Sequence, residues 1–323
     1  MNLYLLQNNE PTGPFPEEEI RQKIYSGELA RTVSARREDG AAWHPVEDLL
    51  NGRDALQPPP LPPDLGDLER LRDPKEKTAL LWMYIVSVFG WLLVAVLVVA
   101  LFGIPLIIIG FFWLINALGE MLFMAHLKTN AVRVSDTQLP ELYRVVATSC
   151  ARLKMPVPEV YVMQENVWNA FAAKFFGRRV VVLLSGAVDS ILLKGDHQQL
   201  AWLVGHELGH HWAGHLNLSQ KLAKMGGFVI WLTLWHSRRA ELTSDRVGLY
   251  CAGNLKSAQR ALINATVGAQ LADRVNPEQA VAQWRQHRGE FFVCYRTLYS
   301  THPQLLARLD YLNAAAREFG MAQ

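Results

Sequence analysis

The chain has 323 residues and half of them are hydrophobic, which predicts two domains with a sizeable core. Its formal net charge of +2 at pH 7 is too small to indicate a nucleic-acid partner. The three cysteines are widely spaced, so neither a disulfide framework nor a Cys-x-x-Cys metal pair is expected, and a reducing compartment is favoured. No basic segment leads into a long apolar run near residue 1, so we expect no cleavable signal peptide.

Residues 1–52 are expected to form a small α+β module. The stretch 3–6 predicts a short strand, the Pro-Thr-Gly-Pro stretch at 11–14 a turn, and 17–26 a helix that follows a proline. The Gly-Pro-Phe sequence ending at Phe15, together with Trp43, is similar to a GYF-type adaptor domain of the bacterial kind. This resemblance implies an aromatic surface that binds proline-rich peptides. The alternative is that these aromatic side chains form the core of the module.

A linker is expected over residues 53–77. Its first part contains the run Pro58-Pro59-Pro60-Leu61-Pro62-Pro63, which predicts a stiff polyproline II rod. This rod is either a ligand for the preceding module, most easily one on a neighbouring chain, or only a spacer. Its second part, from Asp64 to Lys77, is dense in both charges.

Residues 78–119 include no charged side chain. As one straight helix they would extend about 63 Å, twice the hydrocarbon thickness of a bilayer. A glycine and a proline at 103 and 105 predict a break, so we expect a hairpin of two transmembrane helices, about 79–101 and 105–123, within a segment 78–124. Basic residues flank both outer ends, which places both ends in the cytoplasm by the positive-inside rule. A buried helical pair in a soluble core is the weaker alternative.

The sequence His206-Glu207-Leu208-Gly209-His210 lies in a stretch with helical apolar spacing that Asp196 can cap. Residues four apart share one face of a helix, so His206 and His210 can bind one metal ion. Glu207 lies beside them and can reach a metal-bound water without being a ligand. This is the H-E-x-x-H arrangement of zinc-dependent hydrolases.

Two acids downstream, Glu241 and Asp245, are also four residues apart. A zinc site with two histidines needs a third protein ligand, and Glu241 fits that place. Asp245 is placed to accept the free ring N–H of a ligating histidine. The alternative is a solvated helix face on which the acids pair with nearby arginines, namely Arg238, Arg239 and Arg246.

His211 and His215 are expected to be solvent or packing residues, because they lie on another face of the helix. A metzincin site would need glycine at 213 and histidine at 216, where the chain has Ala213 and Leu216. The apolar stretch 225–235 is too short to span a bilayer, so a place in the core or at the membrane interface is favoured.

The pairing of His206-Glu207-x-x-His210 with Glu241-x-x-x-Asp245 resembles the HtpX-like membrane zinc metallopeptidases, the gluzincin family that also contains the CAAX prenyl endopeptidases. Two further elements match that family. Asn169-Ala170-Phe171 resembles its element beside the substrate strand, and Ser300-Thr301-His302-Pro303 with Arg308 resembles its C-terminal His-Pro…Arg element. The resemblance covers roughly residues 120–320.

The resemblance implies a mostly α zincin-type metalloprotease domain over residues 125–323 with a small β-sheet. One Zn²⁺ per chain would bind to His206, His210 and Glu241, and Glu207 would be the general base. His302 and Arg308 would stabilise the oxyanion. Asn169, with Ala170 and Phe171, would hold an extended substrate in the stretch 169–184.

The expected protein is therefore an integral membrane protein with several domains: a GYF-like module, a transmembrane hairpin and a peptidase domain. The module and the peptidase domain are expected in the cytoplasm, and the membrane is the inner membrane if the source is bacterial. Quality control or regulated proteolysis is the favoured role. A catalytically inactive membrane scaffold is the alternative. A prenyl-substrate endopeptidase is less favoured, because two spans cannot build the membrane chamber that this activity requires in the family.

Overall fold

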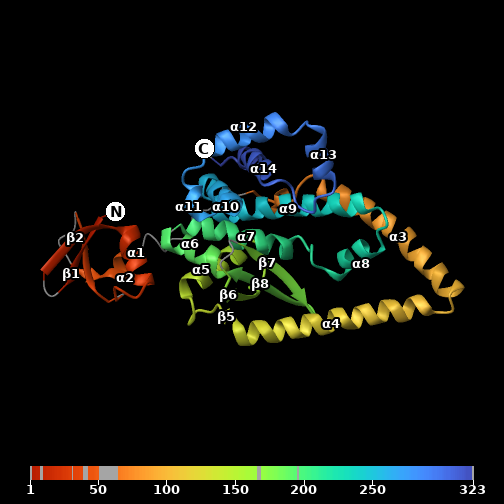
Figure 1. Cartoon of the computed structure of the whole chain (residues 1–323), viewed down its shortest axis with the longest axis horizontal. Helices are drawn as coiled ribbons and strands as arrows, with labels where there is room; N and C mark the ends of the chain where they lie inside the picture. Colours follow the sequence, from red (N-terminus) through yellow and green to blue (C-terminus); the bar gives the residue numbers. More distant parts are fainter. Residues whose placement is uncertain are drawn as a thin grey trace.

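The structure is a computed structural model that describes residues 2–7, 10–30, 32–38, 43–50, 65–165, 169–194 and 196–321. Within these ranges the chain forms a small N-terminal module, two long apolar helices and a mostly helical body with a small sheet (Figure 1). This architecture confirms the predicted fold class. The predicted polyproline rod at 58–63 lies outside the described residues.

The N-terminal module has the strands β1 (Asn2–Gln7), β2 (Glu10–Pro16), β3 (Ser34–Arg37) and β4 (His44–Pro45), and the helices α1 (Glu17–Tyr25) and α2 (Val46–Leu50). Its antiparallel sheet has the order β2-β1-β3-β4. Burial alternates along β1, so that Leu3 and Leu5 face α1 and form the core with Ile20. The predicted helix is confirmed.

The predicted turn at residues 11–14 is wrong. These residues lie in β2, where Pro11 and Thr12 stand opposite Leu6 and Leu5 of β1. Because β2 is an edge strand, one side of its backbone has no partner strand. Proline, which has no N–H to donate, is tolerated at such an edge. Proline and glycine often mark turns, but here they belong to a strand because that strand lies at the edge of the sheet.

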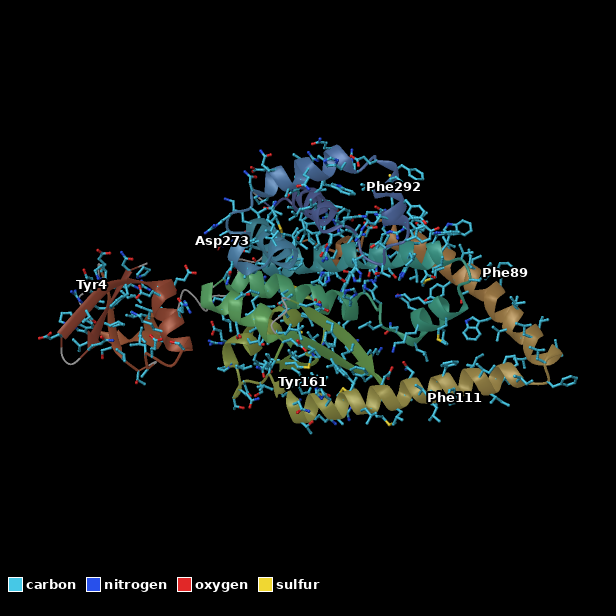
Figure 2. The ribbon with its side chains drawn as sticks, viewed as in Figure 1. Tyr4, Phe89, Phe111, Tyr161, Asp273 and Phe292 are labelled. Carbon is cyan, nitrogen blue, oxygen red and sulfur yellow. The ribbon has the colours of Figure 1, made fainter. Side chains whose placement is uncertain are left out.

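The two apolar helices are α3 (Glu76–Ala100) and α4 (Ile104–Asn130), and both are long and apolar enough to cross a membrane. The break lies where it was predicted. Gly103 adopts a φ of +83°, which favours glycine, and Pro105 stands in the first turn of α4. Figure 2 shows Phe89 of α3 and Phe111 of α4 projecting away from the body, and both are exposed.

Both helices extend further at their outer ends than predicted, because those ends pack against the body. Glu76, the first residue of α3, is fully buried. At the other end, Met124 and Leu127 of α4 pack against Tyr161 and Val182 of the body's sheet. Each helix therefore has one end fixed in the body and one end in the exposed hairpin.

A short helix, α8 (Leu218–Gly226), lies between the two apolar helices and packs against α3 (Figure 1). Trp91 of α3 donates a hydrogen bond to the carbonyl of Leu222, and Lys221 pairs with Glu120 of α4 at 3.4 Å. A Cβ atom on Gly90 would lie 1.8 Å from the carbonyl oxygen of Gly226, so only glycine permits this backbone contact.

The body contains one sheet and a set of helices around a main core, and the other face of the sheet packs against α4 in a second cluster. The strands are β5 (Val132–Arg133), β6 (Glu159–Met163), β7 (Ala170–Phe175) and β8 (Arg178–Leu184). The helices are α5 (Pro140–Arg152), α6 (Ser185–Lys194), α7 (His197–Trp212), α9 (Ile230–Ala252), α10 (Leu255–Val267), α11 (Ala269–Ala272), α12 (Pro277–His287), α13 (Phe291–Leu298) and α14 (Leu305–Glu318). The mostly helical domain with a small β-sheet that the family resemblance implies is therefore present.

The sheet has the order β5-β6-β8-β7, in which β6 and β8 are parallel and the other pairs antiparallel. Strand β7 is therefore an edge strand, and it lies next to α7. The segment before α3, expected as linker, packs into the body: Leu65 and Leu71 belong to its core. The body is thus built from residues on both sides of the hairpin.

Candidate metal centre

Helix α7 carries the H-E-x-x-H sequence in the centre of the body. Asp196 caps it, because its Oδ1 accepts a hydrogen bond of 2.8 Å from the backbone N–H of Gln199. Every residue from Gln199 to Gly209 is buried, and Leu200, Leu203, Val204 and Leu208 belong to the core. The apolar spacing thus fixes the rotation of the helix, which directs His206 and His210 towards α9.

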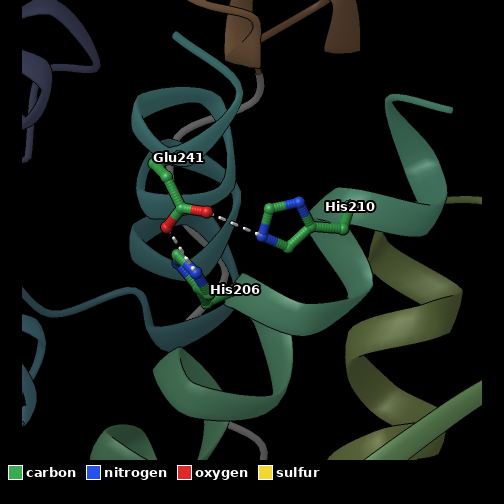
Figure 3. Close-up of side chains that lie close together, drawn as sticks. All are labelled: His206, His210 and Glu241. Atoms are coloured by element: carbon green, nitrogen blue, oxygen red, sulfur yellow. Dashed lines mark ion pairs between the residues drawn. The ribbon is translucent and has the colours of Figure 1, made fainter. Parts of the chain in front are cut away.

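Helix α9 brings the third candidate ligand to these histidines. Gly209 of α7 lies against Ser244 of α9, and a Cβ at this glycine would stand 2.9 Å from the Cα of Ser244. This close approach places Glu241 between the two imidazoles (Figure 3). Its carboxylate oxygens lie 3.5 Å from His206 Nε2 and 3.6 Å from His210 Nε2.

This set of atoms fits a tetrahedral zinc ion. Bonds of about 2.0–2.1 Å in a tetrahedron separate neighbouring ligand atoms by about 3.3 Å. The distances from Glu241, one from each of its two oxygens, are close to that value, and one atom from each of the three residues lies within 4.8 Å of the others. Two imidazole nitrogens and one carboxylate are also the donor set of a catalytic zinc site with an open position.

The electrostatics of the three ligands also favour a cation. Burial lowers the pKa of His210 to about 3, so its imidazole is neutral and offers a lone pair. Burial would raise the pKa of Glu241, but the facing histidines outweigh this and hold it well below its usual range. Burial also opposes charge on His206, yet the neighbouring Asp245 and Glu241 raise its pKa to about 10. The carboxylates therefore attract positive charge to this position.

Asp245 and Arg308 lie behind His206, on the side away from Glu241. The Nδ1 of His206 is 3.0 Å from Asp245 Oδ1, and Arg308 donates to both Asp245 oxygens at 2.8 and 2.5 Å. Asp245 thus occupies the place in which a carboxylate orients a ligand histidine. Arg308, expected to contact the oxyanion, is buried and bound to Asp245 instead.

Glu207 lies beside the ligands and reaches the edge strand. It is buried, and the backbone of Ala172 in β7 lies near its carboxylate. Burial raises the pKa of Glu207 to about 7. A carboxylate with this pKa can both accept and release a proton near neutral pH.

His302 lies on the open side of the site. Its Nε2 is 3.4 Å from Glu241 Oε1, while its side chain remains 64% exposed. The hydroxyl of Thr301 lies 2.8 Å from the other ring nitrogen, Nδ1, which helps to fix the ring. His302 is therefore placed where it can meet a bound molecule.

Comparison with known proteins places this geometry in a family. The chain matches the model of peptidase family M48 over residues 135–231 and 218–316, which together cover more than half of its length. The chain belongs to peptidase family M48. Residues 4–49 match GYF domain 2, which confirms the predicted N-terminal module.

Individual M48 relatives are distant. The chloroplastic plastoglobule-localized metallopeptidase 48 of Arabidopsis thaliana is 25% identical over 189 residues, 54% of each chain. A protease HtpX homologue of Thermococcus kodakarensis is 25% identical over 59% of this chain and 79% of its own. Another, of Thermodesulfovibrio yellowstonii, is 30% identical over 38% and 44%. The chain thus spans about half the length of the plant and bacterial relatives. No solved structure matches it significantly.

The Asn-Ala-Phe element begins the edge strand of this M48 chain. The Oδ1 of Asn169 accepts from the backbone N–H of Ala170, and the carbonyl of Asn169 accepts from Leu184 of β8. Phe171 packs 6.0 Å from the ring of Phe123 in α4. The element therefore ties β7 to the sheet and to an apolar helix, and Ala172 follows next to Glu207.

The three arginines considered as partners of the acids are engaged elsewhere. Arg238 donates to the carbonyls of Leu298 and Ser300. Arg239 faces Asp73 at 3.7 Å, and Arg246 pairs with Glu318 at 2.8 Å. The solvated-face reading of α9 does not describe this structure, in which Glu241 and Asp245 are both buried.

Two contacts of the site were not foreseen from the sequence. His215, expected as a solvent or packing residue, is buried with its Nδ1 3.1 Å from His210 Nδ1. Its Nε2 lies 3.2 Å from Glu76 at the start of α3. His211, by contrast, packs as expected and contacts the carbonyl of Val180. The sequence signal for the second contact was only an acid, Glu76, just before the uncharged stretch that begins at residue 78.

The stretch 225–235 divides between two environments. Met225, Phe228 and Trp231 are exposed, whereas Leu234 is buried in the body. Since the exposed part follows directly from α8, it lies next to α3. The expected place in the core is therefore confirmed for Leu234, and a place at the membrane interface stays a prediction for the exposed residues.

Proposed function

We propose that this M48 member is a membrane-anchored zinc metalloendopeptidase with one zinc ion per chain. The observation that supports this most is the arrangement of His206, His210 and Glu241 at tetrahedral distances, with Glu207 between them and an edge strand. Each part has a function in peptide hydrolysis. The three residues would hold the ion, and Glu207 lies beside them and near the edge strand β7.

When bound, zinc would polarise the scissile carbonyl and lower the pKa of its water towards about 7. Glu207 accepts the proton of the attacking water and passes it to the leaving amine. Burial raises the pKa of Glu207 above its usual range in the metal-free site, which makes its carboxylate a stronger base than an exposed glutamate.

The substrate is held in extended form along β7. An edge strand offers unpaired backbone groups, and a peptide can add to it as a further strand. Asn169 secures the start of β7 through its contacts with Ala170 and Leu184, so its role is to fix the strand that holds the substrate. His302, exposed on the open side, stabilises the oxyanion, whereas Arg308 supports His206 through Asp245.

Metal removal tests this function directly. We expect the full-length protein in detergent to cleave an unfolded protein substrate, to lose this activity on dialysis against a strong chelator, and to regain it with one equivalent of zinc. Mass spectrometry measures the bound zinc, and a gel assay measures the cleavage of the substrate. Undiminished cleavage by metal-free protein would contradict the proposal.

The scaffold alternative has less support, because both histidines, Glu241 and Glu207 are all present in this chain. A prenyl-substrate activity also has less support, because the described residues contain only two helices able to cross a membrane. We therefore favour protein or peptide substrates in quality control or regulated proteolysis. We propose four units: 1–52 as adaptor module, 53–77 as the segment before the hairpin, of which the part from Leu65 packs into the body, 78–124 as hairpin and 125–323 as peptidase domain.

We propose that α3 and α4 span the membrane with the body and the module in the cytoplasm. Phe102 at the tip of the hairpin is 96% exposed, and Cys294 on α13 is exposed, whereas Cys150 and Cys251 are buried. In intact cells a membrane-impermeant maleimide should label a Phe102→Cys variant at the tip. Cys294 should react only after permeabilisation. Labelling of Cys294 in intact cells would contradict this topology.

We propose that the GYF module binds proline-rich peptides. Phe15 and Trp43 remain partly exposed, although Phe15 also contacts the module's core. Because the module has its own core, residues 1–52 can be studied alone with a peptide of residues 55–66. We expect amide shifts at Phe15 and Trp43 with this peptide but none with a control in which alanine replaces proline. No shifts at millimolar peptide would leave the proline run as a spacer.

A further inference from the structure

A buried chain of polar groups connects His210 to the first apolar helix. His210 Nδ1 lies 3.1 Å from His215 Nδ1, and His215 Nε2 lies 3.2 Å from Glu76 Oε1. The side chains of His215 and Glu76 are 3% and 0% exposed. Because Glu76 is the first residue of α3, this chain leads from a metal-ligand candidate directly into the hairpin.

The direction of the hydrogen bonds follows from the proposed function, on which this inference rests. If His210 binds the metal through Nε2, the N–H of its neutral ring is on Nδ1, where it can only donate. His215 then accepts at Nδ1 and has its own N–H on Nε2, which donates to the carboxylate of Glu76. Every group in the chain thus has a donor facing an acceptor.

The carboxylate at the end of this chain is itself fixed. Arg72 donates to Glu76 Oε1 at 2.5 Å, and the hydroxyl of Thr243 in α9 donates to the other oxygen, Oε2. The backbone N–H of Asp73 donates in turn to this hydroxyl at 2.8 Å. A buried carboxylate is costly unless it is paired and hydrogen-bonded, and these groups meet that requirement.

The two ligand histidines therefore have equivalent support. His206 donates directly to Asp245, which Arg308 holds. His210 reaches a carboxylate held by an arginine only through a second imidazole, that of His215. Such outer partners fix the tautomer and the orientation of a ligand histidine and make it a better donor to the metal.

We propose that Glu76, at the start of the first membrane helix, is a positioning residue for the metal ligand His210 and acts through His215. The metal centre then depends on a residue that lies outside both of its helices, α7 and α9. A displacement of α3 relative to the body would move Glu76, and His210 would then no longer be held in its orientation.

A structural role alone makes a different prediction. If Glu76 only attached the hairpin to the body, its replacement would lower thermal stability and leave the zinc affinity of the folded protein unchanged. Zinc affinity, measured by competition with a chromogenic chelator on the full chain in detergent, therefore separates the two roles. The thermal transition of the metal-free protein serves as the second measurement.

Glu76→Gln keeps the shape of the side chain and removes its charge. We expect zinc to bind about 10–100-fold more weakly, the usual loss for an outer partner of a ligand histidine. Glu120→Gln is the matched control, because Glu120 is the other acid within the two apolar helices and pairs with Lys221 of α8. The control should bind zinc as the wild type does. Unchanged zinc affinity in a folded Glu76→Gln protein would overturn the proposal.

A double-mutant cycle tests the route through His215. His215→Ala should weaken zinc binding to a similar extent, and the double variant should be no weaker than the worse single variant, because both break one chain. Losses that multiply would mean two independent effects and would overturn the proposal. If Glu76→Gln shows no cooperative thermal transition, His215→Ala is compared with His215→Gln, which should recover part of the affinity. A wild-type protein that binds no zinc would instead refute the proposed function.

Discussion

Glu207→Gln should lower kcat/KM for peptide cleavage by about three orders of magnitude while the protein still binds one zinc ion. A glutamine amide has nearly the same shape as the carboxylate but cannot take a proton from water, so the base is lost and the ligands remain. The proposed ligand atoms belong to His206, His210 and Glu241, and Glu207 is not among them. Zinc analysis and steady-state kinetics with a quenched fluorescent peptide measure the two outcomes.

Glu278→Gln is a suitable control for this prediction. Glu278 is an exposed glutamate in the first turn of α12, outside the metal centre, so its replacement should leave kcat/KM unchanged. The inactive Glu207→Gln protein should also retain bound substrates, which mass spectrometry of the co-purified proteins can identify. Activity within tenfold of the wild type would show that another group is the base.

The metal helix could be predicted from the sequence because its determinants are local. The apolar spacing of Leu200, Leu203, Val204 and Leu208 and the cap at Asp196 specify both the helix and its buried face. Once that face is known, the positions of His206 and His210 follow from the geometry of a helix. The pair Glu241 and Asp245 follows in the same way, although only the family resemblance indicated that the two helices meet.

The contacts that support the ligands could not be predicted, because they depend on how distant segments pack. Glu76 and His215 are 139 residues apart, and no local pattern indicates that they touch. Arg308 was assigned to the oxyanion because its distance from His302 matched a family element, yet spacing alone does not define where a guanidinium points. In the structure the packing of α14 against α9 directs it to Asp245.

Two stretches were predicted wrongly because their local composition did not reveal where they lie in the fold. The prolines of β2 indicated a turn, but β2 is an edge strand, in which proline is tolerated. Similarly, the charged segment before α3 indicated a solvated linker. Leu65 and Leu71 within it are buried, and Arg72 lies against Trp212 of the metal helix, 5.4 Å from the ring centre. Charged side chains there serve to fix the start of the hairpin against the body.

Glu241→Ala is expected to abolish stoichiometric zinc binding and, with it, peptide cleavage. The variant retains only two protein ligands, whereas a catalytic zinc site has three. The loss of affinity should exceed the roughly 10–100-fold loss that removal of an outer partner causes. Zinc should also stop stabilising the protein: at a zinc concentration 100 times Kd, the wild type gains about 2.7 kcal/mol of unfolding free energy, and the variant should gain none.

One measurement and a second variant make this last prediction decisive. Differential scanning fluorimetry with and without zinc should show an increase in Tm for the wild type and for Glu278→Ala, but not for Glu241→Ala. Glu241→Gln should behave as Glu241→Ala does, because its neutral amide is a poor ligand although it fills the same space between the imidazoles. Full zinc binding by both Glu241 variants would mean that the third ligand is a different residue. His302 would then be the first candidate, since its Nε2 lies 3.4 Å from the carboxylate it would replace.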